Sequence, residues 1–494
     1  MALPDALKRD LDALCASHTG SVKATPFRED SLLMHDPTKA TPALVSGVYW
    51  VASELVTDIM RESLRMKPEA GLQPMPSWSI LVPHPAKRHV GVPKFYGMSV
   101  FGVPSKDIRK DGVEAHYVFN PTLRPEQEYG VVRTMDVISK WGGAFFVADC
   151  GFGKTVCMAS IIHRVQRKAM IVVPRITLLE QLSSNIPGML GCKIGTLQGT
   201  QSEDALKALS ECDVLLVSLD SLGQVAYPQA FLDQYGLVIF DEAHHMAART
   251  LSTILPRVLA KRIVGFSATP DRRDGLEHAL YWLLGPVAFV YQRLPHITGA
   301  SETVHVKLVR PSVTIPDKVL YNGTLNFSGM VTALTESDVR NDFLISLALD
   351  AVKDRKKILM ITALREHVEV LGTLLSGTDH EAVHGGMSTK DRARASVPTK
   401  ILVATYGMLE EGFDDPLIDT LILCTPRSRV QQTIGRAERT ALGKLKPMVY
   451  DVVDSNHIFE AMSVKRVAFY KTRGFKVEGG KPLAVFEPDG VVIN

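Results

Sequence analysis

The strongest constraint on the fold of this chain is a repeated alternation of short apolar runs with stretches of helix length. Between Gly142 and Gln292 the apolar runs are AFFVAD, AMIVVP, DVLLVSL, GLVIFDEAH and RIVGFSATP. After residue 341 the alternation resumes with KKILMITA, HEAVHGG, KILVATYGM, DTLILCTP and KPMVYDVVD. Strands separated by helix-length intervals form parallel sheets that helices cover. The sequence therefore predicts an α/β fold with two such domains in tandem.

The length of the chain calls for more than one hydrophobic core. At 494 residues it exceeds the usual size of a single domain. The first 120 residues do not show the alternation, so we expect a separate α+β accessory domain there. The expected organisation is an accessory domain over residues 1–120, a first α/β domain over 121–295, a linker over 296–340 and a second α/β domain over 341–494.

Composition excludes several classes of protein. The 56 basic and 53 acidic residues give a net charge of +3, so any nucleic-acid-binding surface must be local. The six cysteines form no C-x-x-C pair, which favours reduced thiols in an intracellular compartment over disulfides or structural zinc. No apolar run approaches the roughly 18 residues of a membrane helix, and the first residues do not form a signal peptide. We expect a soluble intracellular protein without membrane partners.

A glycine loop follows the first apolar run of the α/β region. The stretch ADCGFGKTVCM, residues 148–158, has the spacing of a phosphate-binding loop. Backbone N–H groups at such a strand-to-helix turn can wrap a triphosphate, Lys154 can reach the β- and γ-phosphates, and the Thr155 hydroxyl can ligate Mg²⁺. The alternative is an ordinary glycine turn before a helix. The predicted ATP-binding residues of the loop are Gly151, Phe152, Gly153, Lys154, Thr155 and Val156.

Two acidic residues follow the apolar run YGLVIF. In open parallel sheets, ligands bind beyond the carboxyl ends of the strands, so Asp241 and Glu242 are candidates for the same site as the loop. Asp241 can hold Mg²⁺, and Glu242 can orient and deprotonate an attacking water. The alternative is an acidic N-cap, because carboxylates favour the start of a helix.

Four motifs occur in an order typical of one large family. The phosphate loop is followed by DEAH at residues 241–244, SATP at 267–270 and QQTIGRAER at 431–439. With these motifs the chain resembles superfamily 2 helicases, over about residues 123–454. The stretches SATPDRRDG and EEGFDDP are most similar to the branch that contains XPB, the phage UvsW recombination helicase and the poxviral transcript-release helicase.

The resemblance implies two RecA-like domains with ATP between them and Mg²⁺ as the metal cofactor. It also implies roles for individual residues, each of which has a purely structural alternative such as a solvated loop, a strand end or a basic helix. Adenine and ribose contacts are implied for Gln127, Gly412 and Asp414. Catalytic roles beside Lys154, Asp241 and Glu242 are implied for Gln432, Arg436 and Arg439. Coupling of ATP state to strand movement is implied for His244, Ser267 and Thr269. Contacts to the nucleic-acid backbone, which hold a strand without reading its sequence, are implied for Pro174, Arg175, Ser218, His384 and Thr405.

The accessory domain contains a basic stretch. Between residues 81 and 110 there are six Lys or Arg and one acid, Asp107, and aromatic residues are interleaved with them. This mixture suits backbone tracking and base stacking. The alternative is the solvated face of a β-rich fold. In the branch that the chain resembles, an N-terminal domain engages duplex or branched DNA.

These features predict an ATP-dependent DNA helicase or duplex DNA translocase whose partner is duplex, forked or branched DNA. An RNA helicase or transcript-release factor uses the same motor, so RNA stays possible as the partner. A motor subunit of a restriction enzyme is a further alternative. A non-catalytic binding module is less consistent with the presence of Lys154, Glu242 and Arg439.

The two arginines of the last motif generate a direct test. A positive charge delivered to the γ-phosphate only during catalysis is worth on the order of 10³ to 10⁵ in rate. Arg439→Ala, and separately Arg436→Ala, should leave ATP affinity within a few-fold while nucleic-acid-stimulated turnover falls to near background. Steady-state ATPase and nucleotide-binding measurements check this. Normal hydrolysis by both variants would contradict the assignment.

Overall fold

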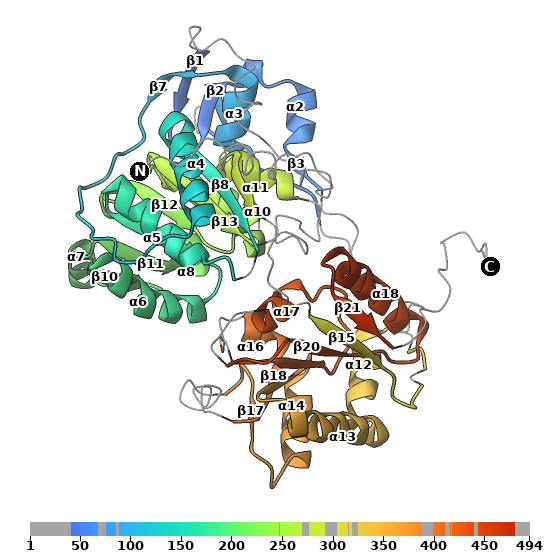
Figure 1. Cartoon of the computed structure of the whole chain (residues 1–494). Helices are drawn as coiled ribbons and strands as arrows, with labels where there is room; N and C mark the ends of the chain where they lie inside the picture. Colours follow the sequence, from blue (N-terminus) through green and yellow to red (C-terminus); the bar gives the residue numbers. More distant parts are fainter. Residues whose placement is uncertain are drawn as a thin grey trace. The chain divides into compact units, whose positions relative to one another are not determined.

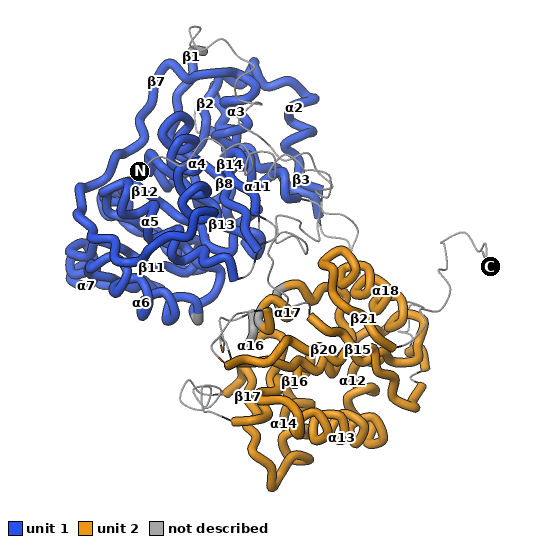
Figure 2. Tube along the Cα trace, in the orientation of Figure 1, with its two compact units in different colours: residues 1–292 blue, residues 293–494 orange. Residues whose placement is uncertain are grey.

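The computed structural model divides the chain into two compact units, residues 1–292 and 293–494 (Figure 2). The first unit contains a small mixed sheet and a seven-stranded parallel sheet, and the second contains another seven-stranded parallel sheet (Figure 1). The α/β prediction of two parallel-sheet domains after an α+β region is confirmed. The structure describes residues 41–67, 76–84, 88–149, 151–246, 248–268, 276–291, 304–314, 316–318, 325–387, 399–410, 415, 417–438 and 443–479.

The N-terminal sheet has five strands in the order β5-β6-β2-β1-β7, with β1 and β7 parallel and the other pairs antiparallel. The strands are β1 (Thr41–Val45), β2 (Tyr49–Ala52), β5 (Val82–Pro83), β6 (His89–Val92) and β7 (Pro104–Asp107). One face packs on helix α3 (Lys94–Phe101). A Cβ at Gly97 of this helix would lie 2.4 Å from the Tyr49 ring, so only glycine lets the helix backbone approach the sheet this closely. The helix α2 (Asp58–Ser63) and the short pair β3 (Arg65–Met66) and β4 (Trp78–Ser79) complete this region.

The first seven-stranded sheet has the order β10-β11-β9-β12-β13-β8-β14, and all its pairs are parallel. The five predicted apolar runs form β8, β9, β11, β12 and β13, and the structure adds two edge strands. Their bounds are β8 (Gly143–Ala148), β9 (Ala169–Val173), β10 (Ile194–Leu197), β11 (Val214–Ser218), β12 (Leu237–Phe240), β13 (Arg262–Ser267) and β14 (Val287–Tyr291).

Helices cover both faces of this sheet. Alternate side chains of β8 divide between two cores: Phe146 packs with α4, α5 and α6, and Phe145 packs with α8, α9, α10 and α11. Because both faces are buried, the strands read as continuous apolar runs rather than alternating ones. The helices are α4 (Pro125–Trp141), α5 (Lys154–Val165), α6 (Ile176–Leu190), α7 (Glu203–Ser210), α8 (Leu219–Gln224), α9 (Gln229–Leu232), α10 (Ala248–Ile254) and α11 (Glu277–Leu284).

The second seven-stranded sheet has the order β17-β18-β16-β19-β20-β15-β21, again with parallel pairs. Helices α16, α17 and α18 pack on one face, and α13 and α14 on the other. The strands are β15 (His305–Val309), β16 (Ile358–Thr362), β17 (His380–Val383), β18 (Ile401–Thr405), β19 (Thr420–Leu423), β20 (Met448–Val452) and β21 (Lys476–Glu478). The helices are α12 (Phe327–Thr335), α13 (Asp338–Asp354), α14 (Arg365–Leu374), α16 (Tyr406–Glu410), α17 (Gln431–Ala437) and α18 (His457–Thr472).

The stretch 296–340, for which we expected a linker, contributes β15 and α12 to the second unit. Strand β15 lies between β20 and β21 and pairs with both. Its sequence, HVKLV, is short and has charged and polar neighbours, so it lacks the continuous apolar pattern that marks the other strands.

A connecting segment, residues 107–120, ties the N-terminal sheet to the first parallel sheet, and we call it the strap. It crosses the amino ends of β13, β12 and β9 in turn and then reaches the end of α6. The backbone hydrogen bonds that hold it are Lys110 N to Leu259 O at 2.7 Å, Val113 N to Gln234 O at 2.8 Å, Ala115 N to Gln166 O at 3.3 Å and Val118 N to Leu190 O at 3.1 Å.

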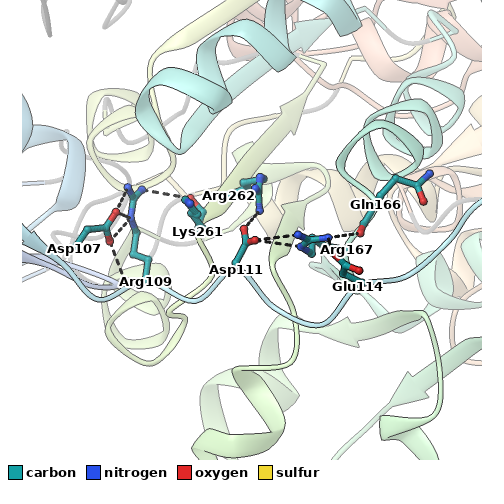
Figure 3. A network of polar contacts seen from close by, with 8 residues as sticks. All are labelled: Asp107, Arg109, Asp111, Glu114, Gln166, Arg167, Lys261 and Arg262. Atoms are coloured by element: carbon teal, nitrogen blue, oxygen red, sulfur yellow. Dashed lines mark hydrogen bonds and ion pairs between the residues drawn. The ribbon is translucent and has the colours of Figure 1, made fainter.

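Asp111 is the electrostatic centre of the strap (Figure 3). Its carboxylate accepts hydrogen bonds from Arg262 Nη1 at 2.7 Å and from Arg167 Nη2 at 3.1 Å. Burial raises the pKa of Asp111, but hydrogen bonds and charge from Arg262 and Arg167 outweigh this effect and hold the pKa below its ordinary value. One carboxylate therefore joins the first residue of β13 to Arg167, just before β9.

Asp111→Ala should lower the free energy of unfolding by about 1–2 kcal/mol, because two guanidinium groups lose a charged acceptor. The folded-state pKa is depressed, so this stabilisation is present above about pH 4 and is lost as the pH falls through the folded-state pKa. Denaturant unfolding at pH 7 and pH 3 checks both statements. The matched control is Asp136→Ala on α4, whose carboxylate is 64% exposed and lies 3.9 Å from Arg133. Equal effects of the two substitutions at pH 7 would contradict a special role for Asp111.

Candidate active site

The glycine loop joins β8 to α5, as its spacing predicts. Gly151 and Gly153 have φ values of +81° and +86°, which L side chains rarely adopt. A Cβ at Gly153 would also lie 2.5 Å from Gln127 Nε2. The backbone conformation therefore favours glycine at position 153, and a larger residue there would also displace the Gln127 side chain.

Gln127 lies in the first turn of α4 and is buried against the loop. Its Nε2 donates to Phe152 O at 2.7 Å, and its Oε1 accepts from Arg124 N at 2.9 Å. Arg124 Nη2 also donates to Phe152 O, at 2.6 Å. Gln127 and Arg124 thus hold the loop against α4. The adenine contact that the resemblance implies for Gln127 stays a prediction, and Arg124 is a loop contact that we did not predict, since only its place just before the helix could have indicated it.

The two acidic residues lie at the carboxyl end of β12, and the structure brings Glu242 to the loop. Lys154 Nζ lies 3.6 Å from Glu242 Oε1 and donates to Ala148 O at 3.3 Å. Asp241 N donates to Val172 O of the neighbouring strand at 2.9 Å. Because β8, β9 and β12 end at the same edge of the sheet, residues distant in sequence form one charged cluster there.

Glu242 adopts an unusual backbone conformation. Its φ and ψ of 47° and 44° lie in the left-handed region, and among the described residues Gln166 is the one other non-glycine residue with positive φ. Such conformations cost of order 1–3 kcal/mol and cluster at functional sites. The residue with this strained backbone, Glu242, is the one whose carboxylate contacts Lys154 on one side and His244 on the other.

A second polar link runs from Glu242 to β13. Its Oε2 lies 3.4 Å from His244 Nδ1, and the same nitrogen lies 3.0 Å from Ser267 Oγ. His244 and Ser267, two of the predicted coupling residues, therefore contact each other beside the predicted catalytic carboxylate. The third, Thr269, lies outside the described residues.

Burial shifts the acid–base behaviour of Asp241. Desolvation and, after it, the neighbouring charge of Glu242 raise the pKa of Asp241 to about 7, while Lys154 opposes the shift. The Thr155 hydroxyl and the Asp241 carboxylate are hard oxygen donors of the kind that Mg²⁺ prefers, so the donor chemistry fits this metal. A divalent cation would remove the repulsion between the two carboxylates.

Predicted nucleic-acid contacts of the first unit lie along the same carboxyl edge. Pro174 and Arg175 follow β9, and Arg175 is the N-cap of α6. Ser218 ends β11, where it pairs in register with Val173, and its Oγ lies 2.7 Å from Ser221 Oγ. Ser221 was not predicted, and its position one turn into α8 was the available signal.

In the second unit, two predicted contacts lie close together. His384 follows β17 and Thr405 ends β18, and these strands are paired with Val383 opposite Ala404. Both side chains are buried, and His384 Nε2 lies 3.2 Å from Glu369 Oε1. Gln432 and Arg436 belong to α17, but their side chains are outside the described part. Gly412, Asp414 and Arg439 also lie outside the described residues.

Comparisons with known proteins give one family match and several relatives. Residues 120–272 match the family described as "Type III restriction enzyme, res subunit" (ResIII). The chain is 27% identical over 413 residues to "Putative ATP-dependent RNA helicase L396" of Acanthamoeba polyphaga mimivirus, covering 79% of this chain and 76% of the relative. It is 22% identical over 384 residues to "Putative helicase 161L" of Invertebrate iridescent virus 6, covering 74% and 84%.

The crystal structure of T4 UvsW aligns with 89% of this chain and 99% of that chain, at 14% identity and a TM-score of 0.36. Residues 120–272 therefore match the ResIII family, and over about three quarters of its length the chain is similar to viral proteins named as putative helicases. Within the described part of the chain, no helix is both long and apolar enough to cross a bilayer.

Asp241→Asn should stabilise the nucleotide-free protein at pH 8. The pKa of Asp241 is raised on folding, so its contribution to stability is fully present below about pH 4 and is lost as the pH rises through about 7. The gain in Tm, roughly 2–4 °C per kcal/mol, should therefore shrink when the pH is lowered to 5. Thermal unfolding checks this, with Asp220→Asn on α8 as the exposed control. A pH-independent effect of Asp241→Asn would contradict the predicted titration.

Proposed function

We propose that this protein is an ATP-dependent DNA helicase or duplex DNA translocase of superfamily 2. The contact of Lys154 Nζ with Glu242 Oε1 at 3.6 Å, beside Asp241 at the ends of adjacent parallel strands, is the observation that supports this proposal best. In the proposed site, Lys154 is the cation for the phosphates and the neighbouring Glu242 carboxylate is the base. Branched or duplex DNA as the substrate rests on the likeness to the UvsW branch noted in the sequence.

Each residue has a part in the proposed mechanism. Lys154 neutralises the β- and γ-phosphates and is then released from Glu242, which becomes free to orient and deprotonate water. Thr155 and Asp241 would hold Mg²⁺, which supplies charge neutralisation of the phosphates when bound. His244 contacts both Glu242 and Ser267, so a change at the γ-phosphate reaches β13 through His244.

RNA is the second candidate substrate. Its support is the mimivirus relative, whose name describes an RNA helicase. The predicted strand contacts, Arg175, Ser218 and Thr405, suit a phosphate backbone of either kind. ATPase stimulation by single-stranded DNA, forked DNA, four-way DNA, RNA and RNA–DNA hybrid at equal nucleotide concentration separates the two. Stimulation by RNA alone would overturn the DNA assignment.

Glu242→Gln should retain ATP binding and lose hydrolysis by about 10²- to 10⁴-fold, because an amide cannot accept the proton from water. Lys154→Ala should lose both turnover and affinity. Single-turnover hydrolysis and equilibrium binding of a fluorescent ATP analogue separate these outcomes, and Glu203→Gln at the exposed start of α7 is the matched control. Loss of ATP binding in Glu242→Gln would make Glu242 a structural residue, and full activity of Lys154→Ala would exclude the loop as the phosphate site.

A further inference from the structure

The N-terminal sheet has a second face, opposite to α3. Val45, Tyr49, Val51 and Val90 point to the α3 side and are buried. The residues between them point the other way, and in register they form a row across the sheet: Leu44 is opposite both Trp50 and Lys106, and Trp50 is opposite Gly91. We call this the outer face. Its described side chains are half-buried or exposed.

The outer face is hollowed. A cavity of about 560 Å³ is lined by Leu44, Trp50, His84, His89, Ser105 and Lys106 among others, and so draws on β1, β2, β6, β7 and the residue after β5. This volume falls within the roughly 300–1,000 Å³ of small-ligand sites. This hollow is distinct from the proposed ATP site, which lies at the carboxyl edge of the first parallel sheet.

Three aromatic rings make one side of this hollow. The Trp50 and His84 rings meet edge to face with centroids 5.6 Å apart, and His84 meets His89 in the same manner at 6.0 Å. The Trp50 ring leans over Gly91, where a Cβ would lie 3.3 Å from it. Trp50 Nε1 donates to Ser46 Oγ at 3.1 Å, which anchors the indole. The rings therefore offer a preformed stacking surface.

The polar groups of the hollow suit a phosphate but do not recognise the hydrogen-bonding groups of a particular base. Lys106 forms no ion pair with any other described residue, and the exposed Arg88 precedes His89. The nearby acid, Asp107, is already paired with Arg109 at 2.7 Å. Ser105 Oγ donates to Ala43 O at 2.9 Å, and the indole N–H is likewise used within the protein. What remains is an aromatic surface next to unneutralised positive charge.

We propose that this hollow binds an unpaired base of a single nucleic-acid strand, with the base stacked on Trp50 and its phosphate at Lys106. Stacking on an aromatic ring beside a basic groove is sequence-tolerant and serves to hold single strands. Single-stranded DNA and RNA share this chemistry. The proposal rests on the proposed function in that the motor must act on nucleic acid, and it adds a second attachment point in the same unit.

The first test is the binding of labelled oligothymidylate and oligouridylate to the nucleotide-free full chain. Trp50→Ala should weaken binding by about 5- to 150-fold, the worth of one stacked base, whereas Trp50→Phe retains a ring and should stay within a few-fold. An oligomer with abasic sites should bind wild type and Trp50→Ala equally. The stronger of the two oligomers identifies the natural strand, DNA or RNA.

Two further readouts separate stacking from a merely structural role. Oligonucleotide binding should quench tryptophan fluorescence in wild type, and part of this quenching should disappear in Trp50→Phe. Lys106→Ala should lower the slope of log affinity against log salt by about 0.7, while Lys207→Ala on the exposed surface of α7 leaves it unchanged.

All pocket variants should retain ATPase that depends on Lys154, which keeps this test independent of the motor assignment. If ATPase persists but Trp50→Ala binds both oligomers as wild type does, the hollow holds another occupant and the proposal is overturned. If no Lys154-dependent ATPase exists, the proposed function fails, while a loss of oligonucleotide binding in Trp50→Ala would still support the hollow as a single-strand site.

Discussion

The parallel pairing of β12 with β9 and β13 is the constraint on which the rest of the first unit depends. It brings the ends of four separate chain segments to one edge, so that Lys154, Glu242 and Ser267 can lie within two or three polar contacts of one another. Parallel strands can be paired only through crossover connections, and these connections place helices on both faces. The buried faces supply the free energy of folding, and the exposed edge is left for chemistry.

This arrangement makes the site locally less stable. Asp241 is buried with its pKa raised to about 7, and Glu242 next to it has a left-handed backbone. Neither feature helps the empty protein to fold. In the proposed mechanism a divalent cation would relieve the repulsion between the two carboxylates, and the phosphates would draw Lys154 away from Glu242.

Much of this could be predicted from the sequence, and the exceptions have physical reasons. Continuous apolar runs marked the central strands of both sheets, because those strands are buried on both faces. Strand β15 was not predicted because Lys307 interrupts the apolar residues of its sequence, HVKLV. The placement of the glycine loop after β8 and of Asp241 and Glu242 after β12 was predictable, because each follows a continuous apolar run. Arg124 and Ser221 act through contacts that the fold creates, and the hollow at Trp50 draws one or two residues from each of several strands, so no continuous pattern announces it.

The strap gives the two edges of the first parallel sheet different tasks. Its hydrogen bonds attach the N-terminal sheet to the amino ends of β9, β12 and β13, whereas the candidate ATP site lies at the carboxyl ends of these same strands. Packed sheets are stiff, so each strand keeps its two ends at a fixed distance from each other. Asp111 binds arginines at the amino ends of two of these strands: Arg262 on β13 and Arg167 just before β9. A strand held on the outer face at Trp50 would therefore keep a constant position relative to Lys154 and Glu242, and movement of nucleic acid would have to come from elements beyond this unit.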